Sequence, residues 1–275
     1  MKDIIINMST RNFWEGSKMK LGFIGTGGIT TILVNGFLTK DKRMDVVVSP
    51  RNAERSRYLL EKYPHNVSIA KNNQEVVDLT DYVFLSVKPE MAEEAIKPLV
   101  FCERHKVINL VAGLTLETLR NWIGNVDLLV HAIPMSFAAH GYGPVVLYPD
   151  EPEARKLLKL VGEVFAVDSS ENVRILQAIT SVQASFYTLL NSIVEWEMDK
   201  GLPADFANAY TSSLFLAFTK TLQGIDREGL YQLSNEMTPK GLNWMTKTNL
   251  KKENAIDAWS NALTLALERL LPDED

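Results

Sequence analysis

Short apolar runs rich in β-branched residues alternate with helical stretches over the first two thirds of the chain. The segments between the runs have apolar residues at the spacing of a helix face. This alternation is typical of βαβ units built around a parallel sheet. We therefore predict an α/β domain over residues 19–168, with the following strands: Leu21–Ile24, Asp45–Val48, Tyr82–Val87, Val107–Val111, Leu128–Ile133 and Val145–Tyr148.

The pattern becomes wholly helical after Asp168, and no later segment has the alternation of a strand. Asp168 and Glu171 have the spacing of an N-terminal capping signal. Gly201 is a typical residue to end a helix, and Pro203 suits the start of the next. We predict an all-α domain over residues 169–275, with helices over 171–200, which can be kinked, and over 204–222, 227–236 and 253–271.

The helices of this second part have more apolar surface than a small helical domain can bury alone. Phe215, Leu216, Phe218, Trp259 and Leu263 are examples. Burial against a second copy predicts a homodimer or a higher homo-oligomer. Packing of a helix pair on the sheet domain is the alternative interpretation.

Composition excludes several classes of protein. The chain has 275 residues and a net charge of −5 without a basic cluster, which argues against nucleic-acid binding. Cys102 is the single cysteine, and the four histidines lack ligand spacing, so we expect neither a disulfide nor a metal site. No apolar run approaches the ~20 residues of a membrane span, and we expect a soluble, cytoplasmic protein. Residues 1–18 precede an internal methionine, Met19, and are interpreted as an N-terminal extension or an alternative start.

A glycine-rich turn follows the first predicted strand directly and opens a helix. It comprises Gly25, Thr26, Gly27, Gly28 and Ile29. In dinucleotide-binding folds the first glycine makes the tight turn and the second lets the pyrophosphate approach the backbone. The third position of the motif is Thr30 instead of glycine. A tight βα connection without a ligand is the alternative, but the position after the first strand favours a cofactor site.

The end of the second strand indicates which dinucleotide is bound. NAD enzymes have an acidic residue there that holds the ribose hydroxyls. This chain instead has Ser49, Arg51 and Asn52, and a hydroxyl with a guanidinium suits a 2′-phosphate. We therefore predict NADP (NADPH) as the cofactor, with Arg51 as an ordinary solvated charge being the alternative.

Several segments together resemble the pyrroline-5-carboxylate reductase family from Met19 onward. They are the glycine-rich turn, Val87-Lys88-Pro89 at a strand end, Asn73, the turn at Ala112-Gly113, and Gly201-Leu202-Pro203 after the long helix. The resemblance implies a Rossmann-type domain followed by a helical dimerisation domain. It implies NADPH-dependent reduction of pyrroline-5-carboxylate to proline, or of a related C=N substrate. It also implies that Asn73, Val87, Lys88, Pro89, Ala112 and Gly113 contact the cofactor.

The chain departs from the family where substrate would lie. The family's Met-Pro-Asn-Thr-Pro-Ala segment reads here Ile133 to Ala138, which makes Pro134, Met135 and Ser136 the candidates. The family's Ser-Pro-Gly-Gly-Thr-Thr loop reads Thr238 to Asn243, so Lys240, Gly241 and Asn243 are the candidates of a partner subunit. Lys240 stands where a glycine could have needed positive φ. Lys240 and Asn243 can bind a carboxylate in place of the lost hydroxyls, or the pocket can take a different substrate.

No catalytic dyad is recognisable, which agrees with a reaction that depends mainly on the orientation of a hydride donor. A β-hydroxyacid dehydrogenase is an alternative, but such enzymes resemble one another in a lysine on the long helix. No lysine occurs between Glu171 and Asp199. A non-catalytic NADP-binding sensor or regulator is the third interpretation, because the loop threonines are missing.

Overall fold

The computed structural model describes residues 18–271, so the expected extension lies outside the described residues apart from Lys18. The described chain divides into two compact units, residues 18–176 and 177–271. The boundary falls within helix α7 (Ser170–Thr180). Among the described residues, no helix has the length and apolarity needed to cross a membrane.

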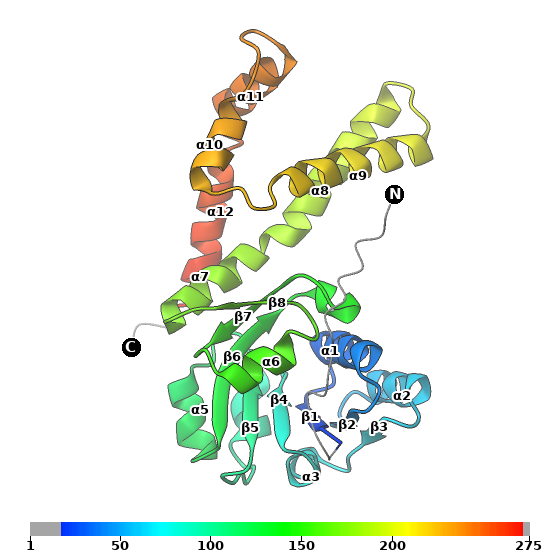
Figure 1. Ribbon diagram of the computed structural model, residues 1–275, viewed down its shortest axis with the longest axis vertical. Helices are drawn as coiled ribbons and strands as arrows, with labels where there is room; N and C mark the ends of the chain where they lie inside the picture. The colour runs from blue at the N-terminus through cyan, green and yellow to red at the C-terminus, as the bar shows by residue number, and fades with distance from the viewer. Residues whose placement is uncertain (1–17, 272–275) are drawn as a thin grey trace. The chain divides into compact units, whose positions relative to one another are not determined.

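The first unit is an eight-stranded sheet with helices on both faces (Figure 1). The strand order is β3-β2-β1-β4-β5-β6-β7-β8, in which β1 to β6 have the arrangement of a dinucleotide-binding fold. The expected α/β fold class, with a Rossmann-type domain before a helical region, is therefore confirmed. The strands are β1 (Lys20–Ile24), β2 (Asp45–Val48), β3 (Val67–Ile69), β4 (Tyr82–Leu85), β5 (Lys106–Asn109), β6 (Leu128–Pro134), β7 (Pro144–Tyr148) and β8 (Glu163–Ala166).

The sheet is not wholly parallel, which corrects the simplest expectation from the sequence. Strand β7 is antiparallel to β6, and β8 is parallel to β7. A parallel pair needs a crossover of about a dozen residues or more, usually containing a helix. Only residues 135–143, with the short 3-10 helix η2 (Ser136–His140), connect β6 to β7, so the chain turns back. Strands β3 and β8 were not predicted, because each is short and has only one buried residue.

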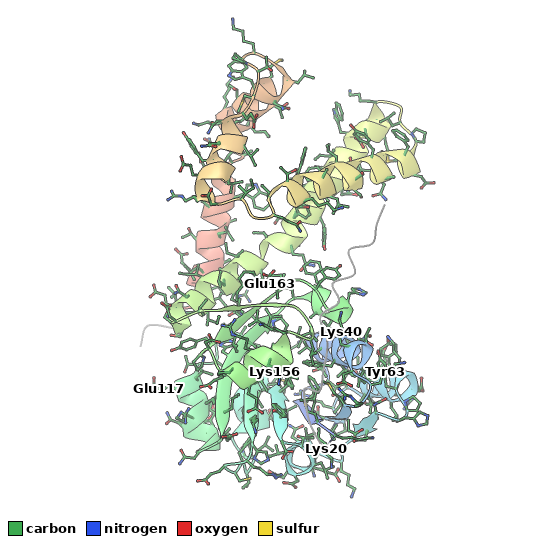
Figure 2. The ribbon with its side chains drawn as sticks, in the orientation of Figure 1. Lys20, Lys40, Tyr63, Glu117, Lys156 and Glu163 are labelled. Carbon is green, nitrogen blue, oxygen red and sulfur yellow. The ribbon has the colours of Figure 1, made fainter. Side chains whose placement is uncertain are left out.

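Two apolar cores, one on each face of the sheet, hold the helices in place. Helices α1, α2 and α6 pack on one face with η2, and α3, α4 and α5 pack on the other. Lys20 at the start of β1 and Lys40 at the end of α1 mark the course of the first βα unit (Figure 2). The helices are α1 (Gly28–Lys40), α2 (Ala53–Lys62), α3 (Asn73–Leu79), α4 (Ala92–Ile96), α5 (Leu116–Ile123) and α6 (Pro152–Leu158), with a 3-10 turn η1 (Pro89–Met91) before α4.

The core beneath α1 depends on close packing. Phe23 and Phe84 lie on neighbouring strands and stack with ring centroids 4.6 Å apart, and Phe37 of α1 contacts Phe84 at 5.7 Å. Gly36, next to Phe37, faces η2. A Cβ atom at Gly36 would lie 2.1 Å from the carbonyl oxygen of Ala138. The first helix can lie this close to η2 only because residue 36 has no side chain.

The predicted helix over residues 171–200 is divided in two. Helix α7 ends at Thr180, and α8 (Val182–Asp199) begins after Ser181. The hydroxyls of Thr180 and Ser181 donate to the carbonyls of Gln177 and Ala178, each at 2.7 Å. Such bonds compete with the helical hydrogen bonds of the backbone and commonly bend or interrupt a helix.

The second unit consists of helices throughout its described residues, as predicted. Helix α8 packs against α9, and in this pair Thr211 donates a 3.0 Å hydrogen bond to the buried carboxylate of Glu197. Helix α11 was not predicted, since its sequence is rich in Thr, Asn and Lys and none of its residues is buried. The remaining helices are α9 (Ala204–Thr221), α10 (Arg227–Asn235), α11 (Leu242–Lys252) and α12 (Asp257–Glu268).

Candidate functional site

The glycine-rich turn connects β1 to α1 at the carboxyl edge of the sheet. Gly25 has a φ of +98°, and a Cβ there would lie 2.6 Å from the backbone oxygen of Ser86. Only glycine fits this position. Gly27 has an ordinary φ of −94°, and a Cβ there would meet no atom within 4 Å. The backbone at Gly27 is therefore open on the side where a pyrophosphate would approach, which fits the dinucleotide-binding turn.

Buried hydroxyls fix one side of this turn to the end of β2. The backbone N–H of Gly25 donates to the Ser49 hydroxyl at 2.9 Å, and the Thr26 hydroxyl donates to the Ser49 carbonyl at 2.6 Å. Only 1% of Ser49 is exposed. This placement argues against the expectation that the Ser49 hydroxyl faces a 2′-phosphate, because the side chain is buried and its oxygen accepts a hydrogen bond within the turn. Ser49 therefore has a structural role, in which it stabilises the conformation of the turn.

A second pair of hydroxyls fixes the other side of the turn. Thr30 donates to the Gly25 carbonyl at 2.5 Å and lies 2.7 Å from the Ser86 hydroxyl. Ser86, at the end of β4, also contacts the Gly25 carbonyl at 2.7 Å. Thr30, which replaces the third glycine of the motif, thus bonds the turn to β4. Sequence reasoning did not assign Thr30 or Ser86 a role, and the only signal was the hydroxyl at a position where glycine is usual.

A cavity of about 450 Å³ lies over the turn, between the ends of β1, β2 and β4. It brings together seven of the predicted cofactor residues, which are Gly25, Thr26, Gly27, Arg51, Asn52, Val87 and Lys88. The cavity is also lined by residues that the sequence did not single out, namely Ala53, Ser86, Glu90 and Met91. Lys88 and Glu90 form an exposed ion pair across 3.9 Å.

The end of β2 presents positive charge and no carboxylate to this cavity. Arg51 is exposed, and its guanidinium has no hydrogen bond or ion pair with any described residue. Asn52 is the N-cap of α2, because its Oδ1 accepts the backbone N–H of Arg55 at 3.1 Å. The side-chain oxygen of Asn52 is therefore used within the helix and does not contact a phosphate. Arg51 is therefore the residue at this strand end that is available to an anion.

The other predicted cofactor residues lie outside the residues that line the cavity. Gly28 and Ile29 begin α1, and Pro89 begins η1. Asn73, at the start of α3, donates to the carbonyl of Ala95 at 3.3 Å. Ala112 and Gly113 form the turn after β5, which Asn109 stabilises by donating to the Leu114 carbonyl at 2.9 Å and accepting from the Val111 N–H at 3.0 Å. Gly113 has a φ of +75°.

The substrate candidates of the first unit follow the end of β6. Pro134 ends the strand, and Met135 is the residue before η2, both half-buried. Ser136 is exposed on the first turn of η2. Phe137 stacks on Tyr142 with ring centroids 5.8 Å apart, which gives this segment an aromatic surface.

The candidates of the second unit lie at the start of α11. Lys240 adopts a φ of +61°, a conformation that favours glycine, as expected for a lysine at a glycine position. Gly241 is the N-cap of α11 and has no side chain to satisfy the free N–H groups of the helix. Lys240 and Asn243 are exposed, and neither has a side-chain ion pair or hydrogen bond with a described residue.

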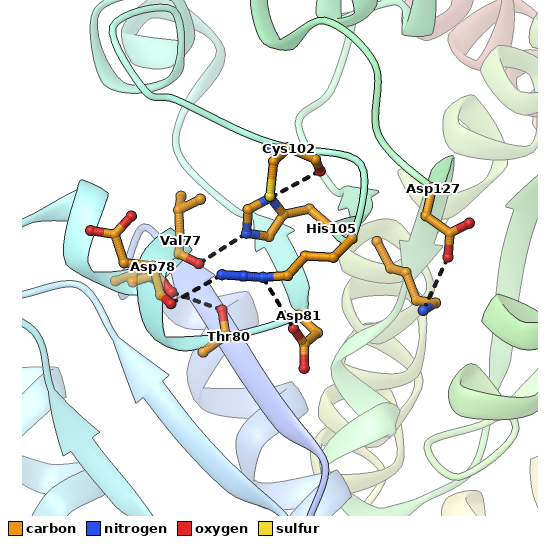
Figure 3. A network of polar contacts seen from close by, with 10 residues as sticks. Val77, Asp78, Thr80, Asp81, Cys102, His105 and Asp127 are labelled. Carbon is orange, nitrogen blue, oxygen red and sulfur yellow. Dashed lines mark hydrogen bonds and ion pairs between the residues drawn. The ribbon is translucent and has the colours of Figure 1, made fainter.

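The opposite, amino edge of the sheet is densely charged, and several of its polar side chains bond one another or the backbone. Figure 3 shows His105 between Cys102 and Val77, with a ring nitrogen 3.1 Å from the carbonyl oxygen of Val77. The other ring nitrogen accepts the backbone N–H of Cys102 at 2.9 Å. Burial lowers the pKa of His105. Lys106 lies 3.1 Å from Asp127, and 3.7 Å from Glu153, which bonds the Tyr82 hydroxyl. These contacts indicate a structural role for this edge.

One histidine of the sheet has no such partner. His131 lies on β6 between Asn109 of β5 and Tyr148 of β7, and only 8% of it is exposed. Its Nε2 has no hydrogen-bond partner among the described residues. Burial lowers the pKa of His131 to about 4, so the imidazole is neutral at physiological pH. Within residues 18–271, no group of three His, Cys, Asp or Glu side chains is placed to hold a metal ion.

Comparison with known proteins connects this geometry to one group of enzymes. The family model described as "NADP oxidoreductase coenzyme F420-dependent" matches residues 20–113. Pyrroline-5-carboxylate reductase 1 of Bacillus spizizenii is 25% identical over 262 residues, which cover 91% of this chain and 88% of the relative.

Solved structures agree with the sequence relatives. The 1-pyrroline-5-carboxylate reductase of Streptococcus pyogenes has a TM-score of 0.80 at 22% identity, covering 92% of this chain and 98% of its own. The pyrroline carboxylate reductase of Plasmodium falciparum, solved with NADP bound, has a TM-score of 0.77 at 17% identity, covering 92% and 97%. At these identities the structural likeness shows the fold.

The fold, the glycine-rich turn and the family match define an oxidoreductase-type protein with a nicotinamide-dinucleotide-binding domain. Within that class, the relatives confirm the resemblance predicted from the sequence: the chain is a divergent pyrroline-5-carboxylate reductase-like protein.

Proposed function

We propose that this protein is an NADPH-dependent reductase of a C=N bond, and that its substrate is pyrroline-5-carboxylate or a related cyclic imine. The observation that supports this most strongly is the open backbone at Gly27, held between β1, β2 and β4 by buried hydroxyls. A bound nicotinamide dinucleotide would supply the hydride. The residues of the chain would bind and orient the cofactor and the imine.

The choice of NADPH over NADH rests on the end of β2. No acidic residue occupies the position that holds the ribose hydroxyls in NAD enzymes. Arg51 lies there instead, exposed and without an acidic partner among the described residues. A guanidinium binds a phosphate through two parallel charge-assisted hydrogen bonds. We assign the 2′-phosphate to Arg51 alone, which keeps the predicted guanidinium contact and omits the one predicted for the Ser49 hydroxyl.

For the substrate, we propose contacts from both candidate loops. Pro134, Met135 and Ser136 would position the ring, and Lys240, Gly241 and Asn243 of a second copy of the chain would bind a carboxylate through charge, backbone N–H and amide groups. The exposed ammonium of Lys240 supports this, since a carboxylate is attracted both by that charge and by the start of a helix. The cytoplasmic location expected from the sequence remains a prediction.

We also propose that the protein works as a homodimer through its helical unit. Large apolar side chains of this unit are exposed in the single chain, among them Trp196 (61%), Phe206 (57%), Phe218 (54%) and Leu242 (82%). Large apolar side chains exposed in such number on one unit commonly mark an interface. Sedimentation at micromolar concentration should give twice the chain mass of 30.9 kDa or more, and a stable monomer would contradict the proposal.

The proposed activity is tested by following NADPH oxidation at 340 nm with pyrroline-5-carboxylate and a panel of other cyclic imines, and with NADH in parallel. Turnover with pyrroline-5-carboxylate supports the proposal directly. Turnover with only non-carboxylated imines keeps the reaction class and rejects the role of Lys240. Cofactor binding without turnover of any imine would reject a reductase and favour the sensing role.

A further inference from the structure

Arg55 is a second unpaired guanidinium beside the glycine-rich turn, and it was not among the predicted cofactor residues. It lies in the first turn of α2. Its Nη1 atom is 3.7 Å from the point where a Cβ of Gly28 would be. Gly28 is the first residue of α1. The side chain of Arg55 therefore extends from the start of one helix to the start of another.

The position of the Arg55 guanidinium is electrostatically unfavourable in the protein without a bound ligand. The amino end of a helix carries partial positive charge, which disfavours a cation in its first turn. The free N–H groups of α1 begin at Gly28, and the Gly27 N-cap provides no side-chain acceptor. The guanidinium of Arg55 adds a full positive charge to that end of α1 and to the first turn of α2.

Glu54 lies in the same first turn of α2, but no acidic side chain among the described residues forms an ion pair with Arg55. Arg43, Arg104 and Arg155 are each paired with an aspartate at 2.6, 3.5 and 2.6 Å. The Arg55 side chain has no ion pair or hydrogen bond with a described residue. Glu90, the carboxylate that lines the cavity, is paired with Lys88. An unpaired arginine held over a helix start is the arrangement expected where an anion is bound.

The backbone holds Arg55 in this position. Its N–H donates to Asn52 Oδ1 at 3.1 Å, and the buried Ser56 hydroxyl donates to the carbonyl of Asn52 at 2.9 Å. The capped first turn of α2 thus fixes the Cα of Arg55 next to the cavity. Arg51, by contrast, precedes the cap and lies at the end of β2, where the 2′-phosphate is expected.

We propose that Arg55 binds the pyrophosphate of the dinucleotide, from the side opposite the α1 N–H groups, and that it serves NADPH and NADH alike. The inference rests on the proposed cofactor site and assigns a separate residue to each phosphate. Arg51 selects between the two cofactors, and Arg55 adds affinity for both. Neutralising the pyrophosphate would also remove the unfavourable charge at the two helix starts.

The test is a fluorescence titration of the full-length protein with NADPH and with NADH, for the wild type and for R55Q, R51Q and R57Q. We expect R55Q to raise the Kd of both cofactors by about tenfold, the loss of one charge-assisted contact. R51Q should raise the Kd of NADPH alone. R57Q is the matched control, since Arg57 is on the same helix and lines a groove with Tyr58 and Glu61; its affinities should not change.

A second readout separates binding from folding. Without cofactor, the melting temperature of R55Q should equal or exceed that of the wild type, because a cation is removed from two helix starts. A lowered melting temperature with unchanged Kd values would mean that Arg55 is structural and would overturn the proposal. Loss of NADPH affinity alone would move Arg55 to the 2′-phosphate and overturn the assignment. If the wild type binds neither dinucleotide, the proposed function itself fails.

Discussion

The close contact between α1 and η2 predicts a large effect of a single methyl group. In Gly36→Ala the new Cβ would lie 2.1 Å from the carbonyl oxygen of Ala138 and 2.9 Å from a methyl of Val161. An ordinary carbon–oxygen contact is about 3.3 Å, so the helix and η2 must separate by about 1 Å. The Cβ is fixed by the backbone of α1, and the Ala138 oxygen belongs to the backbone of η2. Neither atom can rotate away as the end of a flexible side chain can.

The magnitude follows from two opposing effects. Overpacking of this kind costs about 3 kcal/mol at the upper end of its usual range. Alanine is favoured over glycine inside a helix by about 1 kcal/mol. We therefore expect Gly36→Ala to lower the free energy of unfolding of the first unit by about 2 kcal/mol.

Urea unfolding followed by far-UV circular dichroism measures this change, with the helical and α/β transitions fitted separately because the chain has two units. Gly27→Ala is the matched control, since its Cβ meets nothing within 4 Å. It should cost less than about 1 kcal/mol, the loss of a favourable N-cap residue. If Gly36→Ala proves as stable as the wild type, the packing of α1 on η2 described here is wrong.

Three further predictions concern the turn, the buried histidine and the strained loop. Thr30→Ala and Ser86→Ala should each destabilise the first unit by about 1–2 kcal/mol. The double variant should be destabilised by less than the sum of the two, because the two hydroxyls bond each other and the Gly25 carbonyl. Full additivity in urea unfolding would reject this coupling. His131 has a folded-state pKa of about 4 against about 6.5 when unfolded, so the unfolded chain binds the proton first and stability falls by up to about 3 kcal/mol as pH drops through that window. His131→Asn should flatten the pH dependence of the free energy of unfolding between these values, and an unchanged slope would contradict the buried, neutral imidazole. Lys240→Gly should raise the stability of the second unit by about 0.5–1 kcal/mol through relief of the positive φ, while raising KM for a carboxylated imine; a lower melting temperature would argue against the strain.

Local chemistry determined what the sequence could predict of the fold. The strands β1, β2, β4, β5, β6 and β7 are apolar and β-branched, so pattern alone found them. The direction of β7 depended on the length of the β6–β7 connection, which the pattern does not reveal. The interruption at Ser181 depends on two hydroxyls that bond their own helix, and helix α11 lacks a buried face.

The sequence predicted the parts of the candidate site that depend on backbone conformation. It did not predict the parts that depend on the direction of a side chain. Gly25 and Gly27 could be assigned because the motif fixes their conformations. Ser49 was expected to face the cofactor, but it is buried directly after β2, and its hydroxyl accepts the backbone N–H of Gly25. Thr30 and Ser86 lie 56 residues apart, and their contact follows only from the pairing of β1 with β4.

The central claim, that the turn at Gly27 holds a dinucleotide, is tested most directly by measuring NADPH binding to wild type and Gly27→Ala by isothermal titration calorimetry. The side of Gly27 that would carry the methyl is empty in the protein, so the variant should fold with an unchanged far-UV spectrum. We predict that the wild type binds NADPH and that Gly27→Ala raises the Kd at least tenfold, because the methyl occupies the space of the pyrophosphate. Equal affinity in a folded variant, or no binding by the wild type, would contradict the account.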